Sequence, residues 1–169
     1  APREGHGWNE LRHRLFKLGE LVCTGRNTEK AMVRPLEGAL ADADWLGQYV
    51  ETIPREAEWL AGRFWPGPLT IVLPKRDVIP DIVTAGLATV AVRVPAPAFA
   101  RSMITKAGVP VAAPSANRFG RISPTTASAV QQELGGSIDL IIDAGRTLHG
   151  IESTVVGFGP HGLHLLRLG

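Results

Sequence analysis

The sequence lacks several features that would assign it to a class at once. Its 169 residues include a single cysteine, Cys23, which excludes an internal disulfide and cannot form a metal site by itself. No run of about eighteen apolar residues occurs, so we expect no membrane span. No basic stretch followed by an apolar one resembles a secretion leader. These absences predict a cytoplasmic protein.

The sequence also lacks a large excess of either positive or negative charge. Eighteen lysines and arginines face 16 acidic residues, and a net charge of +2 does not by itself predict nucleic-acid binding. A basic face would require the N-terminal cations to cluster: Arg12, Arg14, Lys17, Arg26 and Lys30. The five histidines show no metal-ligand spacing, and P-loop, GxGxxG, GxSxG and HExxH motifs are missing. We therefore expect no protein-held metal, and any ATP must be bound without a Walker loop.

What is present predicts one domain over residues 1–169, with helices and strands interleaved. Apolar spacing, caps and prolines predict helices over 8–18, 28–34, from Asp42 to Val50, from Pro54 to Phe64, over 95–106, and from Ser123 to Leu134. Short β-branched or apolar runs predict strands over 20–23, 69–73, 89–94, 109–113, 138–142, 153–158 and 163–166. The alternation favours an α/β fold with a single sheet.

Small polar side chains follow the strand predicted over 109–113. Ser115 and Asn117 come directly after it, and Ser123 with Pro124 would open the next helix. Side chains at the end of a strand can contact a ligand at a sheet edge, and a helix N-terminus favours phosphate. The alternative is structural: Ser123 is a helix cap and Asn117 holds a turn. The pattern alone leaves both open.

Two arginines lie in apolar strands and need partners there. A buried guanidinium without a partner costs several kcal/mol, about the penalty of any unpaired buried charge. Arg93 would therefore pair with an aspartate, Asp139 or Asp143, or bind a carboxylate ligand through its planar fork. Arg167 could serve a phosphate. Ser153, in the polar triplet 152–154 at the start of a strand, either satisfies neighbouring backbone or faces a ligand.

Seven segments, in order and spacing, resemble the threonylcarbamoyl-AMP synthase (YrdC-like) family. They are FWPGPLTIVL (64–73), TVAVRVP (89–95), VPVAAPSAN (109–117), ISPTTA (122–127), IDLIIDAG (138–145), GIESTVV (150–156) and LLRLG (165–169). The similarity is strongest over residues 55–169. It implies an α/β fold with a single twisted, mostly mixed sheet, flanking helices and an open cleft.

The resemblance also implies a reaction and its partners. The family's enzymes condense L-threonine, bicarbonate and ATP, with Mg²⁺, into threonylcarbamoyl-AMP and pyrophosphate, for N6-threonylcarbamoyl modification of adenosine 37 in tRNA. By this resemblance tRNA and downstream threonylcarbamoyl-transfer proteins are further partners. Carried over by position, the residues expected to bind ATP are Ser115, Asn117, Ser123, Arg167 and Arg34, and those expected to bind threonine are Arg93 and Ser153.

The N-terminal third departs from the family pattern. TGR (24–26) stands where a PTETVYGLG-like motif is expected, and no KGR triplet follows; Arg34 is either its remnant or part of a helix. Two alternatives to the synthase therefore stay open. One is a degenerate, non-catalytic module that binds RNA or nucleotide, and the other is a related carbamoyl-transfer domain.

Overall fold

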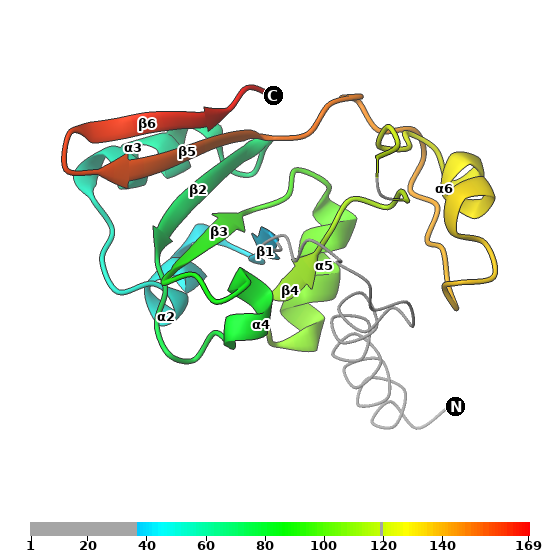
Figure 1. The fold of residues 1–169 in the computed structure, drawn as a ribbon. Coiled ribbons are helices and arrows are strands. Elements are labelled where there is room, and N and C mark those ends of the chain that lie inside the picture. Colours follow the sequence, from blue (N-terminus) through cyan, green and yellow to red (C-terminus); the bar gives the residue numbers. More distant parts are fainter. Residues whose placement is uncertain (1–36, 119) are drawn as a thin grey trace.

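The computed structural model describes residues 37–118 and 120–169. Along this part of the chain the elements are β1 (Glu37–Ala39), η1 (Ala43–Trp45), α2 (Leu46–Tyr49), α3 (Arg55–Phe64), β2 (Leu69–Pro74), α4 (Asp81–Thr84), β3 (Thr89–Arg93), α5 (Ala98–Ala107), β4 (Val111–Ala113), α6 (Ala127–Leu134), β5 (Thr154–Gly159) and β6 (Gly162–Arg167) (Figure 1). The elements predicted over 8–18, 20–23 and 28–34, and the N-terminal cations, lie outside the described residues.

The six strands form one mixed sheet in the order β4-β1-β3-β2-β5-β6. β1 runs parallel to β3 and β2 parallel to β5, whereas the β1–β4, β2–β3 and β5–β6 pairs are antiparallel. The α/β class with a single mixed sheet and flanking helices is therefore confirmed. The open cleft stays a prediction.

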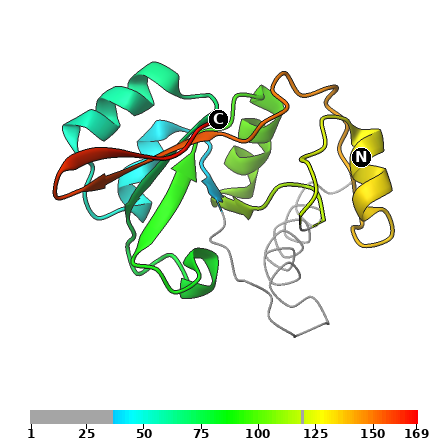
Figure 2. The same ribbon diagram turned by 45° about the horizontal axis from the view of Figure 1, so that its top comes forward.

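One face of the sheet carries the hydrophobic core. Alternate residues of β2 and β3 are buried there, among them Ile71, Leu73 and Val92, which are at most 1% exposed. α2 contributes Leu46, and α3 contributes Ala57. Figure 2 shows α3 lying across this side of the sheet, and burial of these apolar side chains is the main stabilising contribution.

Local signals placed several elements correctly. Asp42 caps η1 by accepting from the Asp44 N–H at 3.1 Å, and the helix expected after Pro54 is α3. The FWPGPLT segment forms the corner predicted for it, where the Trp65 indole N–H donates to the Leu69 carbonyl. The strands expected over 69–73 and 89–94 are β2 and β3.

Two sequence predictions are wrong. The helix expected from Ser123 begins only at Ala127, because Thr126 is its cap and accepts from the Ala129 N–H at 3.2 Å. The strand expected over 138–142 does not form: apart from one isolated bridge, these residues pair with no strand in the described part of the chain. Leu140 is consequently 66% exposed.

β1 and α6 are elements with weak packing signals, β1 in the sequence and α6 in the structure. β1 was not predicted, because Glu-Gly-Ala has no β-branched residue; its conformation comes from pairing with β3 and β4. α6 buries none of its residues, and Figures 1 and 2 show it standing away from the sheet. No helix in the described ranges is long and apolar enough to cross a membrane.

Candidate functional site

The sheet face opposite the core carries charged and hydroxyl side chains. Arg93 follows Val92 in β3, and since Val92 points into the core, Arg93 points to the other face. Glu37 pairs with Ala91, two residues before Arg93, and so shares that face. Val155 pairs with Thr70 on one side and with Arg167 on the other, which aligns side chains from β2 and β6 at the same level. Residues distant in sequence therefore meet across the sheet.

Ser153 is the centre of the resulting arginine cluster, which we define as Glu37, Thr70, Arg93, Ser153 and Arg167. The Ser153 hydroxyl, in a residue 3% exposed, lies 2.6 Å from the Thr70 hydroxyl and donates to Glu37 Oε1 at 3.1 Å. It accepts from Arg167 Nη2 at 3.0 Å. Arg167 also donates to Glu37 Oε1 at 3.1 Å and, through Nε, to the Ser153 carbonyl at 3.0 Å. These contacts fix the guanidinium of Arg167.

Arg93 is paired only in part. Its Nε lies 3.6 Å from Glu37 Oε2, an ion-pair distance too long for a good hydrogen bond. This nitrogen is buried and has no hydrogen-bond partner among the described residues. The aspartates considered from sequence are not its partners: Asp139 and Asp143 are exposed, and Asp143 accepts from the Gly145 N–H. Arg93 thus retains an unused donor on the polar face.

A second group, built around Ser123 and Glu152, lies next in the chain to the arginine cluster. The Ser123 hydroxyl donates to Glu152 Oε1 at 2.7 Å and lies 3.5 Å from Asn117 Oδ1. The Asn117 amide donates to the carbonyls of Arg118 and Arg121, which holds the loop before α6. Glu152 directly precedes Ser153, so the two residues just before β5 belong one to each group.

Glu152 is the charged member of this second group. The Ser123 hydroxyl, and to a smaller extent the backbone N–H of Glu152 itself, hold the pKa of the Glu152 carboxyl below its usual value. Burial opposes this shift, and the positive charge of Arg167, the smallest of the four causes, adds to the lowering. Glu152 is therefore a carboxylate at neutral pH.

The structure unites most, but not all, of the residues proposed from sequence. Arg93, Ser153 and Arg167 meet in the arginine cluster, and Asn117 lies near Ser123. Ser115 is exposed two positions before Asn117 and makes no hydrogen bond to either group in the described part of the chain, and Arg34 lies outside the described residues.

The sequence did not point to Glu37 or Thr70 as site residues. Glu37 lies 116 positions from its hydrogen-bond partner Ser153, and Thr70 lies 83 positions from it. Only the strand order brings them together. A threonine inside the apolar run 69–73 was the one available signal.

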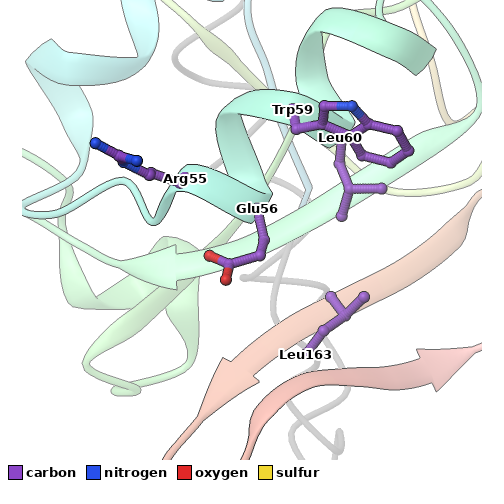
Figure 3. A pocket seen from close by; sticks show the side chains of 5 residues that line it. All are labelled: Arg55, Glu56, Trp59, Leu60 and Leu163. Carbon is purple, nitrogen blue, oxygen red and sulfur yellow. The ribbon is translucent and has the colours of Figure 1, made fainter.

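The polar face shows no metal site in the described part of the chain, and a separate groove lies on the opposite face. Among the described residues, no three histidine, cysteine or acidic side chains lie close enough to hold a metal ion. A shallow groove of about 470 Å³ lies on the α3 side of the sheet, away from the polar face. Figure 3 shows its lining of Arg55, Glu56, Trp59, Leu60 and Leu163.

Comparison with known proteins decides the family. A family model for the Sua5, YciO and YrdC proteins, described as telomere recombination, matches residues 25–169. The chain belongs to the Sua5/YciO/YrdC family. This confirms the resemblance seen in the sequence motifs.

Relatives in this family share long stretches of the chain. It is 49% identical over 135 residues to the threonylcarbamoyl-AMP synthase of Pyrococcus abyssi, and 45% identical over 136 residues to that of Bacillus subtilis. Both alignments cover 80% of this chain but only 40% and 39% of the relatives, so the chain spans about two-fifths of their length.

A solved structure supports the fold. The crystal structure of P. abyssi Sua5 complexed with L-threonine matches 92% of this chain and 43% of its own, at 43% identity and a TM-score of 0.78. That Sua5/YciO/YrdC relative therefore has the same arrangement of strands and helices, and it binds an amino acid that carries a carboxylate.

Proposed function

We propose that the chain acts as an L-threonylcarbamoyladenylate synthase, which condenses threonine, bicarbonate and ATP into threonylcarbamoyl-AMP and pyrophosphate. The observation that carries the proposal is the arginine cluster: Arg93, Ser153 and Arg167 converge on one carboxylate on the polar face of the sheet. The names of the relatives agree with it.

Threonine is assigned to the side of the cluster nearest Arg93. The unused Nε–H of Arg93 and the Ser153 hydroxyl suit an α-carboxylate, because charge-assisted hydrogen bonds from a guanidinium are strong and directional. The P. abyssi complex with L-threonine supports an amino-acid ligand for this fold. Selectivity for threonine would then come from contacts to its hydroxyl and methyl group.

ATP is assigned to the neighbouring polar loop. Ser115, Asn117 and Ser123 supply hydroxyl and amide groups at the end of β4 and before α6, and Arg167 supplies positive charge for phosphate. Arg34 is the fifth residue proposed for ATP. Mg²⁺ would enter as the MgATP substrate, with phosphate oxygens and water as its main ligands. Glu152 is the carboxylate that accepts a hydrogen bond from Ser123 in this group, at 2.7 Å.

The reaction needs alignment more than a protein nucleophile. The threonine nitrogen forms a bond to the carbon of bicarbonate with loss of water, giving a carbamate. A carbamate oxygen then bonds to the α-phosphorus as the bond to pyrophosphate breaks. Holding the reactants together and neutralising phosphate charge can supply most of the acceleration. The arginines and hydroxyls of the two groups suit this task.

The product would feed tRNA modification, so tRNA and threonylcarbamoyl-transfer proteins are the proposed partners. The two alternatives make different predictions. A degenerate RNA-binding module would bind RNA with steep salt dependence and form no adenylate. A carbamoyl-transfer domain would consume ATP without needing threonine.

Threonine-dependent pyrophosphate release tests the site assignment. Ser115→Ala combined with Asn117→Ala should lower the rate strongly, because both removed groups are assigned to ATP. Ser102→Ala, on the exposed surface of α5, is the matched hydroxyl control and should leave the rate unchanged. An unchanged rate in the double variant would show that ATP binds elsewhere.

A further inference from the structure

The arginine cluster contains a carboxylate of its own. Glu37 Oε1 accepts from the Ser153 hydroxyl and from Arg167 Nη2, both at 3.1 Å, and Oε2 faces Arg93 at 3.6 Å. Three groups that would bind an external carboxylate thus converge on a side chain of the same chain. Glu37 sits where such a ligand would compete for donors.

The fit of Glu37 to the cluster is incomplete. Arg93 Nε is buried without a hydrogen bond to any described residue, because the nearest Glu37 oxygen is beyond hydrogen-bond range. A buried donor without a partner is costly, so an incoming anion that reaches it gains a contact that Glu37 does not make. An external carboxylate is therefore favoured at Arg93 Nε, while the donors of Ser153 and Arg167 are occupied by Glu37.

The backbone of Glu37 is fixed, but its side chain is not enclosed. β1 is paired with β3 through Glu37 and Ala91 and with β4 through Glu37 and Ala113. The Glu37 side chain remains 26% exposed. The carboxylate can therefore rotate toward solvent while the strand stays in register.

We propose that Glu37 is an internal ligand of the anion site formed by Arg93, Ser153 and Arg167, and that it limits the affinity of this site for external carboxylates. Two guanidinium groups and one carboxylate leave a net charge of +1, which matches a single monoanion. An external carboxylate close to Glu37 must displace it or accept repulsion from it. The identity of the ligand as threonine rests on the proposed function; the role of Glu37 does not.

Calorimetric titration with threonine tests the proposal in Glu37→Gln. Glutamine keeps the shape, and its amide oxygen can still accept from Ser153 and Arg167, so the substitution mainly removes the negative charge. We expect threonine to bind about tenfold more tightly, equivalent to about 1.4 kcal/mol. Where both proteins bind threonine, unchanged or weaker binding by the variant would overturn the proposal, because Glu37 would then not compete with the ligand.

Asp81→Asn is the matched control. Asp81 forms an ion pair with Lys75 at 3.0 Å, and Lys75 follows the end of β2 that lies away from the arginine cluster. Asp81→Asn therefore removes one negative charge from an ion pair outside the cluster. Its threonine affinity should equal that of the unmodified protein. Glu37→Ala, which removes charge and side chain together, should also bind more tightly and serves if the glutamine variant folds poorly.

Acetate separates this proposal from the proposed function, because it carries only the carboxylate. Its effect on Tm is compared with chloride at equal ionic strength. If threonine binds neither protein but acetate raises the Tm of Glu37→Gln more than that of the unmodified protein, Glu37 has the inferred role and the synthase assignment fails. If acetate raises both Tm values equally, Glu37 does not limit the site.

Discussion

Replacing Ser153 by alanine removes the centre of the arginine cluster, and its effect on stability follows from burial. Thr70 is fully buried, and its hydroxyl lies 2.6 Å from the Ser153 hydroxyl. Without Ser153 the Thr70 hydroxyl is left buried with no partner among the described residues, which costs about 1 to 3 kcal/mol. The hydrogen bonds that Glu37 and Arg167 lose contribute less to stability, because both side chains are partly exposed and remain paired with each other at 3.1 Å.

We therefore expect Ser153→Ala to lower the free energy of unfolding by about 2 kcal/mol, mostly through Thr70. Thr70→Val keeps nearly the same shape and replaces the hydroxyl with a methyl group, so it should cost about 1 kcal/mol. The double variant leaves no unpaired hydroxyl at this position. It should be destabilised by about 2 kcal/mol rather than 3, a coupling of about 1 kcal/mol.

Urea unfolding of the four proteins measures this coupling, provided that their m-values agree. A coupling below about 0.3 kcal/mol would refute the reasoning, since additivity within that range is typical of independent sites. It would mean that the two hydroxyls have other partners and that Ser153 does not organise the cluster.

Three further predictions concern other parts of the fold. Ser123→Ala should raise the pKa of Glu152 toward its ordinary value near 4.5, followed by NMR titration. Because the pKa of Glu152 is lower in the folded protein, the stabilisation from this bond is present above the ordinary pKa and is lost as pH falls through the folded pKa. An unchanged titration of Glu152 in the variant would contradict this prediction. Gly67→Ala should cost about 2 to 3 kcal/mol, because its Cβ would collide with the Phe64 carbonyl. Gly62→Ala, in α3 with open space around it, should instead stabilise by up to about 1 kcal/mol, and urea unfolding measures both.

Local rules predicted the elements whose signals lie within a few residues. α3 follows from the proline before it and its apolar spacing, and β2 and β3 follow from their β-branched residues. β1 could not be predicted in this way, because its three residues form a strand only between two neighbours. Segment 138–142 failed for the opposite reason: it has strand composition but no strand beside it in the described part of the chain.

In the site, too, some residues could be predicted from local signals and others depend on the order of the strands. Arg93 and Arg167 stood out because a guanidinium in an apolar strand needs a partner, and Ser153 stood out in a polar triplet at the start of a strand; the family motifs then assigned them ligands. The partner itself, Glu37, lies 130 positions from Arg167, and only sheet order and register bring them together. The helix begun by Thr126 rather than Ser123 is informative too, because it leaves the Ser123 hydroxyl free to bind Glu152.

The most direct test of the proposed function is incorporation of labelled bicarbonate into an adenylate. The protein is incubated with MgATP, threonine and ¹³C-bicarbonate, and the nucleotide products are analysed by mass spectrometry. We predict a threonylcarbamoyl-AMP that carries the label and disappears when either threonine or bicarbonate is omitted. A folded protein that binds ATP but forms no such product would contradict the synthase assignment.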